Sequence, residues 1–240
     1  MRAMILAAGK GRRLGELTRT RPKALLEING KSILHRAVEK CTASGFNDII
    51  VNIHHFAGQV EQEIDRLNGK GFHVEVSDER EMLLETGGGL YKVRSFFKDG
   101  TFLLYNTDII TDMDIAGMLA FHLQHKYLAT LAVRNREGNR FFLINDAGRL
   151  RGWHNRITGE RIVHALPGEE LVEIAFSGIH IIEPEIFTHM WDGVYTMTDL
   201  YMKLAGAFYI NTYRYDAGYW IDAGTPDSLE KARKLLSGIR

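Results

Sequence analysis

The N-terminal segment of the chain is a short apolar run that leads directly into a glycine-rich loop. Residues 4–8, Met-Ile-Leu-Ala-Ala, predict a buried β-strand, and Gly9 and Gly11 follow it. A glycine loop at the end of a strand lets backbone N–H groups approach a phosphate group closely. This arrangement is typical of α/β folds that bind anionic ligands at the ends of their strands, so the segment constrains the fold more than any other.

Basic residues are concentrated around this loop. Six of them fall within fourteen positions and are opposed only by Glu16, although the whole chain carries 30 basic and 30 acidic residues. The six are Lys10, Arg12, Arg13, Arg19, Arg21 and Lys23. A local excess of this kind suits an anionic small molecule, whereas nucleic acid usually requires a basic face spread over the domain. We therefore expect a phosphate-bearing small molecule as ligand and no nucleic-acid partner.

Two known phosphate-binding motifs resemble parts of this region but fail on spacing. The dinucleotide fingerprint requires glycines at its first, third and sixth positions, and the sixth position here is Leu14. Gly30-Lys31-Ser32 looks like the end of a P-loop, but the leading glycine of that motif would fall on Leu25. Asn29-Gly30 is therefore interpreted as a tight turn before the following helix.

Strands and helices alternate along the first half of the chain. Four segments have helical periodicity, namely residues 32–44, 57–67, 89–97 and 115–126. Four apolar or β-branched runs predict the intervening strands, namely residues 48–53, 72–76, 101–105 and 129–133. This alternation predicts an α/β fold with a doubly wound, mostly parallel, Rossmann-like sheet. Beyond residue 135 the strands become shorter, with a hairpin turn at 146–148, so we expect a small antiparallel addition.

Length and composition favour a single large domain. With 240 residues, of which 45% are hydrophobic, the chain can bury a large core without metals or disulfides. The one cysteine, Cys41, lies on an apolar helical stripe, which indicates core packing rather than a nucleophile. No apolar run approaches the ~20 residues that span a bilayer, and the N-terminal segment lacks the pattern of a signal peptide. We therefore expect a cytoplasmic protein with no membrane partner.

Two aspartates follow predicted strands. Asp108 comes soon after the run at 101–105, and Asp222 ends the apolar segment at 220–222. In an open α/β sheet, ligands bind beyond the carboxyl ends of the strands, and an acid there can hold Mg²⁺ against phosphate oxygens. The alternative for either residue is an N-cap or a turn, and for Asp108 these general grounds support both interpretations equally.

Two other groups of metal-ligand residue types are less informative. Asp112 and Asp114 could mimic a metal pair, but they precede a predicted helix, so capping is the preferred interpretation for Asp114. The doublet His54-His55 lacks a third ligand at a suitable spacing, and we predict no metal site there.

A second glycine-rich segment, Leu-Glu-Thr-Gly-Gly-Gly at 84–89, precedes a predicted helix near Leu90. Three successive glycines allow a base or a sugar to lie flat against the backbone. The alternative is a flexible loop. The immediate start of a helix favours a second cradle for the ligand.

Together these motifs resemble the signature of the sugar-1-phosphate nucleotidyltransferases, or NDP-sugar pyrophosphorylases. The matching segments occur in the family's order and span essentially the whole chain. They are Leu6-Ala7-Ala8-Gly9-x-Gly11-x-Arg13, Pro22-Lys23, residues 84–89, Asn106-x-Asp108, Phe176-x-Gly178-Ile179 and Trp220-x-Asp222-x-Gly224-Thr225. The short length and the form of 85–89 look most like bacterial N-acetylmuramate-1-phosphate uridylyltransferases and their mannose- or heptose-1-phosphate relatives.

The resemblance implies a role for each matched residue. Arg13 and Lys23 would be the catalytic cations that hold the phosphates of the nucleotide, and Asp108 and Asp222 would bind Mg²⁺, the implied cofactor. The residues implied around the base and ribose are Ala8, Gly9, Gly11, Thr86, Gly87 and Gly88. The residues implied at the sugar phosphate are Asn155, Arg156 and Gly178, with Asn155-Arg156 standing where the family commonly has Glu-Lys.

The sequence departs from the family pattern at two places. Thr107 stands where the family has glycine before the metal aspartate, and Glu16-Leu17 replaces proline-leucine. Neither departure removes a charged functional group, so both are interpreted as variation within the family. The resemblance implies one nucleotidyltransferase domain over residues 1–240, with a nucleotide-binding half at 1–135 and a sugar-phosphate-binding half at 136–240.

The implied reaction is Mg²⁺-dependent transfer of a nucleotidyl group from an NTP, with UTP favoured, to a sugar-1-phosphate. Its products are an NDP-sugar and pyrophosphate, and the partners are these substrates in a monomer or small homo-oligomer. Guanylyl transfer to mannose- or heptose-1-phosphate is the main alternative. A non-catalytic nucleotide-binding module is less favoured because both metal acids are present, and a nicotinamide dehydrogenase would need the missing third glycine.

Overall fold

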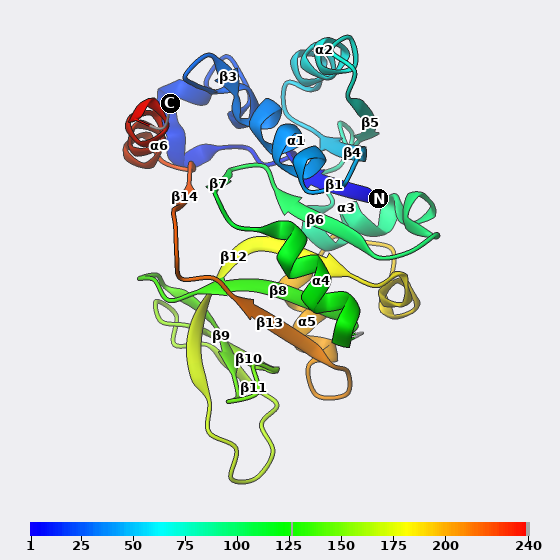
Figure 1. The fold of residues 1–240 in the computed structure, drawn as a ribbon, viewed down its shortest axis with the longest axis vertical. Helices are drawn as coiled ribbons and strands as arrows, with labels where there is room; N and C mark the ends of the chain where they lie inside the picture. The colour runs from blue at the N-terminus through cyan, green and yellow to red at the C-terminus, as the bar shows by residue number, and fades with distance from the viewer. Residues whose placement is uncertain (126, 239–240) are drawn as a thin grey trace.

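The computed structural model describes residues 1–125 and 127–238, within which ten strands form one large sheet (Figure 1). These strands are β1 (Arg2–Leu6), β4 (Asp48–Ile53), β5 (His73–Asp78), β6 (Phe102–Asn106), β8 (Ala129–Arg134), β9 (Arg140–Ile144), β10 (Leu150–Asn155), β11 (Arg161–Val163), β12 (Val172–Ile182) and β13 (Ile210–Arg214). Four short strands form two further sheets, which pair β2 (Glu27–Ile28) with β3 (Lys31–Ser32) and β7 (Ile109–Thr111) with β14 (Trp220–Asp222).

The described helices cover both faces of the large sheet. They are α1 (Ile33–Ala43), α2 (Ala57–Asn68), α3 (Glu85–Lys92), α4 (Ile115–His125), α5 (Met197–Leu204) and α6 (Pro226–Gly238). Short 3-10 segments span Arg12–Thr18, Lys23–Leu25, Arg94–Phe97 and Pro184–His189. None of these helices combines the length and the apolar character needed to cross a bilayer.

The strands near the N-terminus form the parallel part of the sheet. β6, β1, β4 and β5 are neighbours in that order, and each adjacent pair is parallel. Leu6, the last residue of β1, lies opposite Asn52 on β4 and Asn106 on β6. The carboxyl ends of β1, β4 and β6 therefore meet at one edge of the sheet. The glycine loop starts at this edge, and Asp108 follows β6 there.

The remainder of the sheet is organised by β12 and is largely antiparallel. β12 pairs antiparallel with β6, β8 and β9, and the sheet continues from β9 through β10 to β11, at the opposite end of the molecule from β5 (Figure 1). The α/β class and the hairpin turn at 146–148 are confirmed, but the sheet is mixed rather than mostly parallel. The prediction underestimated the antiparallel part because a strand's apolar pattern does not encode its direction.

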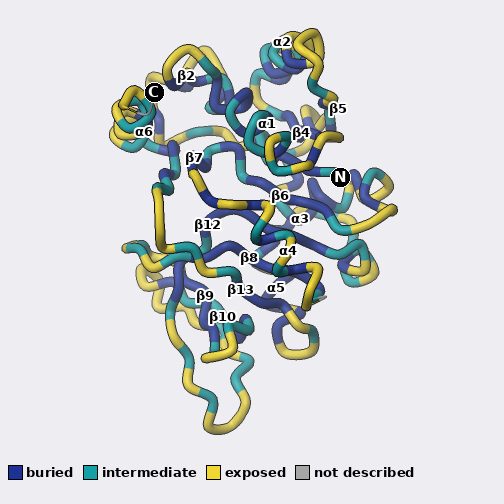
Figure 2. The backbone as a smooth tube through the Cα atoms, in the orientation of Figure 1, coloured by how far each residue is buried: buried dark blue, intermediate teal, exposed yellow. Residues whose placement is uncertain are grey.

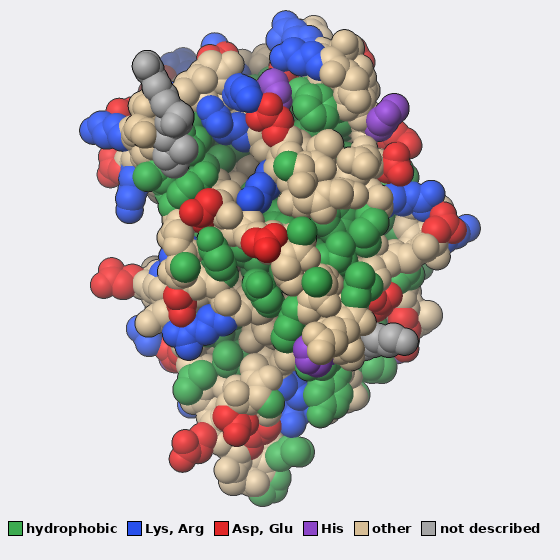
Figure 3. Space-filling model, viewed as in Figure 1, with side chains coloured by type: hydrophobic (Ala, Val, Ile, Leu, Met, Phe, Trp, Pro, Cys, Tyr) green, Lys and Arg blue, Asp and Glu red, His purple; other side chains and the backbone are tan. Residues whose placement is uncertain are grey.

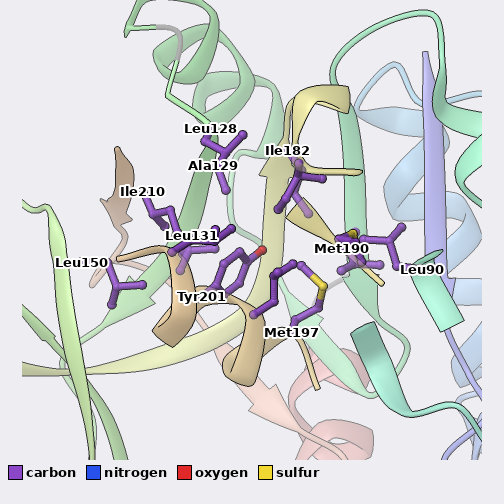
Figure 4. Close-up of a cluster of buried hydrophobic side chains, with 14 of the residues drawn as sticks. Leu90, Leu128, Ala129, Leu131, Leu150, Ile182, Met190, Met197, Tyr201 and Ile210 are labelled. Atoms are coloured by element: carbon purple, nitrogen blue, oxygen red, sulfur yellow. The ribbon is translucent and has the colours of Figure 1, made fainter. Parts of the chain in front are cut away.

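Alternation along β1 divides the core into two layers. Met4 faces a cluster that includes Leu90 of α3 and Tyr201 of α5, part of which Figure 4 shows. Ile5 points to the other face and packs in a cluster with residues of α1, α2 and α4. Cys41 is fully buried in this second cluster, which confirms core packing, and Figure 2 shows that the central strands are buried.

A third, smaller cluster brings the two ends of the chain together. Leu14 after the glycine loop packs with Ile221 of β14 and Leu229 of α6. Figure 1 shows α6 beside the N-terminal loop segment. This packing holds Asp222, the last residue of β14, close to the basic loop.

The predicted helix caps are present. The Ser32 side chain accepts a hydrogen bond from His35 N (2.9 Å) at the start of α1, and Asp114 Oδ1 accepts one from Gly117 N (3.0 Å) at the start of α4. Both contacts satisfy backbone donors of a first helical turn, which confirms the capping interpretation of Asp114. Lys126, the predicted last residue of this helix, lies outside the described residues.

Candidate active site

A cavity of about 540 Å³ opens at the carboxyl ends of β1 and β6. Three chain segments form most of its wall: residues 6–13 after β1, residues 83–86 around the start of α3, and residues 106–108 after β6. Further lining residues are Lys23, Ala24, Asn52 and Gly224. The predicted phosphate loop, the second glycine segment and the first predicted metal acid therefore face one cavity.

The glycine loop begins two residues earlier than the predicted end of the strand. β1 ends at Leu6, so Ala7 and Ala8, predicted as strand, already belong to the loop. Gly11 has φ 63°, and a Cβ there would lie 3.1 Å from Lys23 Cβ, so glycine is required both by conformation and by close approach. A Cβ at Gly9 would meet no atom within 4 Å, so this residue leaves open space in the cavity that it lines.

A buried side-chain network connects this loop to the segment before α3. Asn52 Oδ1 accepts hydrogen bonds from Ala7 N (2.7 Å) and Ala8 N (3.3 Å), while Asn52 Nδ2 donates to Glu79 Oε1 (2.8 Å). Glu79 Oε2 in turn accepts from Leu84 N (3.1 Å). Both side chains are almost completely buried, and burial raises the pKa of Glu79. The two cavity walls are thus joined through one amide and one carboxyl group.

The sequence analysis missed this network, although one signal for it was present. Asn52 is a polar residue inside the buried β-branched run at 48–53, and such a residue must find hydrogen-bond partners. The identity of its partner Glu79, 27 positions later, could not be predicted from local pattern.

Four charged side chains converge at the edge of the cavity. Lys23 Nζ forms an ion pair with Asp108 Oδ2 and lies 3.9 Å from Asp222 Oδ1. Arg13 Nη2 donates to Asp222 Oδ2 at 3.2 Å. Gly224 makes room for this contact, since a Cβ there would lie 2.6 Å from Asp222 Oδ1. The structure therefore brings together all four charged residues that the resemblance singled out, and neither aspartate is engaged as a helix cap.

The two carboxyl groups titrate as a pair. Burial raises the pKa of Asp108, an effect that Lys23 opposes and the neighbouring Asp222 strengthens. Burial acts on Asp222 too, but Lys23 and Arg13 together lower the pKa of that carboxyl. When two like charges are held close together, their pKa values move apart, so that one acid retains a proton more readily than the other. The pair requires cationic neighbours, which Lys23 and Arg13 supply.

The donor set fits a divalent cation of the Mg²⁺ type. Asp222 Oδ1 is buried and has no hydrogen-bond partner among the described residues, which leaves a carboxylate oxygen available to a metal. Carboxylate oxygens are the ligands that Mg²⁺ prefers, and it commonly binds through one or two carboxylates plus phosphate and water. No group of three or more His, Cys, Asp or Glu residues within 1–125 and 127–238 could hold a metal. A cation held by Asp108 and Asp222 would therefore need oxygens from a ligand.

The three consecutive glycines have a packing role that the sequence analysis did not foresee. The prediction placed these glycines before a helix that starts near Leu90. In the structure α3 begins at Glu85, so the glycines lie inside the helix. A Cβ on Gly87 would overlap the ring of Tyr195, and one on Gly88 would overlap the carbonyl oxygen of Gly193. Gly87 N donates to Tyr195 O (2.8 Å), so the helix start packs directly against a distant loop.

Among the residues predicted around the nucleotide, Thr86 lines the cavity and its Oγ1 accepts a hydrogen bond from Met197 N (2.8 Å). Ala8, Gly9 and Gly11 line it as well, whereas Gly87 and Gly88 lie behind its wall. Contact of the last two with a nucleotide stays a prediction.

The three residues predicted at the sugar phosphate lie in different surroundings. Gly178 has φ 80°, and a Cβ there would lie 3.0 Å from Asn106 Nδ2, a residue of the cavity wall. Asn155 is buried, and its Oδ1 accepts a hydrogen bond from Ile157 N (3.1 Å). Arg156 forms an ion pair with Glu173. Gly178 therefore packs against a residue of the cavity wall, and none of these three residues is among those that line the cavity itself.

Charged residues of both signs are interspersed on the face shown in Figure 3.

The fold and this site are those of a nucleotidyltransferase. Residues 2–237 match the family model described as nucleotidyl transferase, and the chain belongs to this family, as the motifs predicted. The chain is 29% identical over 246 residues to the N-acetylmuramate alpha-1-phosphate uridylyltransferase of Caulobacter vibrioides, with 98% of this chain and 96% of that protein covered. It is 30% identical over 244 residues to the Neisseria meningitidis enzyme of the same name, with 98% of each chain covered.

More distant similarity extends to other members and to solved structures. The chain is 27% identical over 243 residues to the mannose-1-phosphate guanylyltransferase of Mycobacterium tuberculosis, with 99% of this chain and 65% of that protein covered. The crystal structure of HddC from Yersinia pseudotuberculosis superposes with a TM-score of 0.78 at 21% identity, with 98% of both chains covered. This last likeness confirms the fold.

Proposed function

We propose that the enzyme transfers a uridylyl group from UTP to a sugar-1-phosphate in the presence of Mg²⁺, giving a UDP-sugar and pyrophosphate. The observation that carries the proposal is the convergence of Arg13, Lys23, Asp108 and Asp222 at a cavity lined by a glycine loop. Two cations and two acids from separate chain segments meet where a polyphosphate would bind. This arrangement suits a reaction between two phosphate-bearing substrates.

The reaction needs no general base from the protein. An oxygen of the sugar-1-phosphate attacks the α-phosphorus of the nucleotide, a new P–O bond forms, and the bond to the β-phosphate breaks with its electron pair leaving on pyrophosphate. A phosphate monoester has a second pKa of about 6, so the attacking oxygen is already largely ionised at neutral pH. The protein must instead bring two repelling anions together and stabilise the charge of the transition state.

The charged side chains divide this work. Arg13 and Lys23 bind the phosphates of the nucleotide, and loop N–H groups after β1 contribute further donors. Asp108 and Asp222 would hold Mg²⁺, which when bound would neutralise charge on the phosphate oxygens. Lys23 and Arg13, which pair with these acids in the structure, are placed to move from carboxylate to phosphate when substrates bind.

The proposed organisation assigns the two halves of the chain to the two substrates. Residues 1–135 carry the glycine loop, the segment around Thr86 and Asp108, and they would bind the nucleotide. Residues 136–240 carry Gly178 and Asp222, and they would bind the sugar-1-phosphate.

The choice of UTP rests on likeness to the two uridylyltransferases described above and on the Glu-Thr-Gly-Gly-Gly segment at 85–89. Backbone groups of a glycine loop can pair with several bases, so physical reasoning from this loop does not select a pyrimidine. Guanylyl transfer to mannose- or heptose-1-phosphate is the second candidate, and the similarity to a mannose-1-phosphate guanylyltransferase favours it.

A matrix of four NTPs against several sugar-1-phosphates, measured by pyrophosphate release, tests the proposal. We expect the highest kcat/KM with UTP and an N-acetylated or related hexose-1-phosphate. A higher kcat/KM for GTP with every sugar would refute the uridylyl assignment and leave the reaction class intact. If no pair of substrates gives pyrophosphate release, the reaction class is refuted.

A further inference from the structure

Arg136, in the loop between β8 and β9, lies over the ring of Trp220 on β14, the strand that ends at Asp222. Its guanidinium carbon lies 4.4 Å from the ring centroid of Trp220, and Trp220 Nε1 donates to Ser177 O (2.9 Å). Trp220 and Asp222 are two residues apart on β14, so their side chains share one face of that strand. Arg136 therefore lies on the same side of β14 as Asp222, the acid whose charge acts on it most strongly.

The orientation of this guanidinium is fixed by uncharged partners. Arg136 Nη1 donates to Glu137 O and Nη2 donates to Phe176 O, both at 3.0 Å. Within 1–125 and 127–238, no carboxylate lies within 4.0 Å of the group, and its buried Nε has no hydrogen-bond partner. A guanidinium carries five N–H donors. Arg136 is thus a half-buried, oriented cation with unused donors, a state that an anion would stabilise.

The charge balance around Asp222 supports an anionic ligand on this side. Arg13 and Lys23 form ion pairs with Asp222 and Asp108, and Arg136 adds a third cation that stacks on Trp220, two residues before Asp222, without contacting either acid. Three cations against two carboxylates leave an excess of positive charge, before any metal ion is added. The glycine-loop cations face the nucleotide cavity, whereas Arg136 stands beside the main chain of β12 next to Gly178, which borders the cavity wall at Asn106.

We propose that Arg136 binds the phosphate group of the acceptor sugar-1-phosphate and orients its attacking oxygen, an inference that rests on the proposed function. A guanidinium fork matches the geometry of a phosphate dianion and can donate two parallel hydrogen bonds to it. Stacking on Trp220 holds the fork in place before the substrate arrives, which lowers the entropy cost of binding. The attack on the α-phosphorus would then start from an oxygen held between Arg136 and the metal acids.

Arg156, which the family resemblance implied for this role, provides the matched control. Its guanidinium lies over the ring of Phe141 at 4.4 Å, and its Nε donates to Glu173 Oε2 at 2.9 Å. Both arginines therefore stack on an aromatic ring, but Arg156 already has a carboxylate partner. Arg156 is more exposed than Arg136, so the melting temperature of each variant is measured beside its kinetics, and the loss of a phosphate contact is expected for Arg136 alone.

The test compares Arg136→Ala, Arg136→Lys and Arg156→Ala with the wild type by pyrophosphate release. For Arg136→Ala we expect the KM of the sugar-1-phosphate to rise at least ~10-fold, the change that loss of a charge-assisted hydrogen bond produces. The KM of the NTP should change less than ~2-fold. Arg136→Lys keeps the charge but not the forked guanidinium, so its KM for the sugar-1-phosphate should lie between those of the wild type and Arg136→Ala.

The opposite patterns would overturn the inference. An unchanged KM for the sugar-1-phosphate in Arg136→Ala, a rise confined to the NTP, or a larger effect in Arg156→Ala would each place the acceptor phosphate elsewhere. A wild type that releases no pyrophosphate would refute the proposed function instead. Calorimetric titration of glucose-1-phosphate into the UTP-saturated wild type and Arg136→Ala would then decide the binding role, with equal affinities contradicting it.

Discussion

Replacement of Asn52 tests whether the buried network between β1 and α3 prepares the nucleotide cavity. Asn52→Ala removes the acceptor for Ala7 N and Ala8 N and the donor to Glu79 Oε1. Each buried polar group left without a partner costs about 1–3 kcal/mol. The contact with Ala8 N is long at 3.3 Å, and Ala7 N is only partly buried, so we expect a loss of about 2–4 kcal/mol in the free energy of unfolding.

This loss should be measurable by thermal unfolding and by steady-state kinetics. For a chain of this size, 1 kcal/mol corresponds to about 2–4 °C in Tm, so Tm should fall by about 5–15 °C. Because Asn52 holds the loop that faces the nucleotide, the KM of the NTP should rise at least ~10-fold, as loss of about 1.4 kcal/mol of binding energy implies. The KM of the sugar-1-phosphate should stay close to the wild-type value.

Asn68 offers a control of the same residue type, whose side chain also both accepts and donates hydrogen bonds but is exposed. Its Nδ2 donates to Val74 O (2.9 Å) and its Oδ1 accepts from Val74 N (2.8 Å), far from the cavity. Asn68→Ala should lower Tm without changing the KM of the NTP. If Asn52→Ala lowers stability and leaves that KM at the Asn68→Ala value, the network is structural only and the reasoning is refuted.

Three further predictions follow from the geometry. Gly88→Ala should lower the free energy of unfolding by about 1–3 kcal/mol because of overlap with a backbone carbonyl, whereas Gly58→Ala in the open part of α2 should be neutral or stabilising; equal melting temperatures would contradict the packing role. Asp108→Asn and Asp222→Asn should each lower kcat at least ~10²-fold with little change in Tm, and near-normal turnover would remove that residue from the metal site. Burial lowers the pKa of His180 to about 3, so below its unfolded pKa of 6.5 the unfolded chain takes up a proton that the folded chain excludes. Stability should therefore fall by up to about 1.4 kcal/mol per pH unit as pH decreases from 6.5 towards 3, and the slope measured in His180→Leu should be smaller.

The residues of the charged centre could be predicted from the sequence because they lie in short segments next to strand ends. The basic loop after β1 and Asp108 after β6 each follow an apolar strand of the parallel sheet, and such positions gather at one edge. Asp222 also ends an apolar run, but its strand, β14, pairs with β7 in a separate two-stranded sheet. α3 begins four residues earlier than predicted and α5 was not predicted, whereas the same local patterns predicted α1, α2, α4 and the Asp114 cap. In each case neighbouring residues determine the structure.

Features that depend on distant partners could not be predicted in the same way. The direction of β12 depends on its pairing with β6, β8 and β9, which its own pattern does not specify. The glycines of α3 are required by a loop more than 100 positions later, and their sequence alone fits a ligand cradle equally well. A role for Arg136 could not be predicted, because it depends on stacking against Trp220, which is 84 positions away.

The proposed reaction requires a sugar-1-phosphate, an NTP and Mg²⁺ together at this site. Purified enzyme supplied with all three should release pyrophosphate and form an NDP-sugar, detected by mass, in equal amounts. Omission of any one component, or addition of excess chelator, should abolish both signals. Pyrophosphate release without the sugar-1-phosphate, or turnover that survives the chelator, would contradict the account.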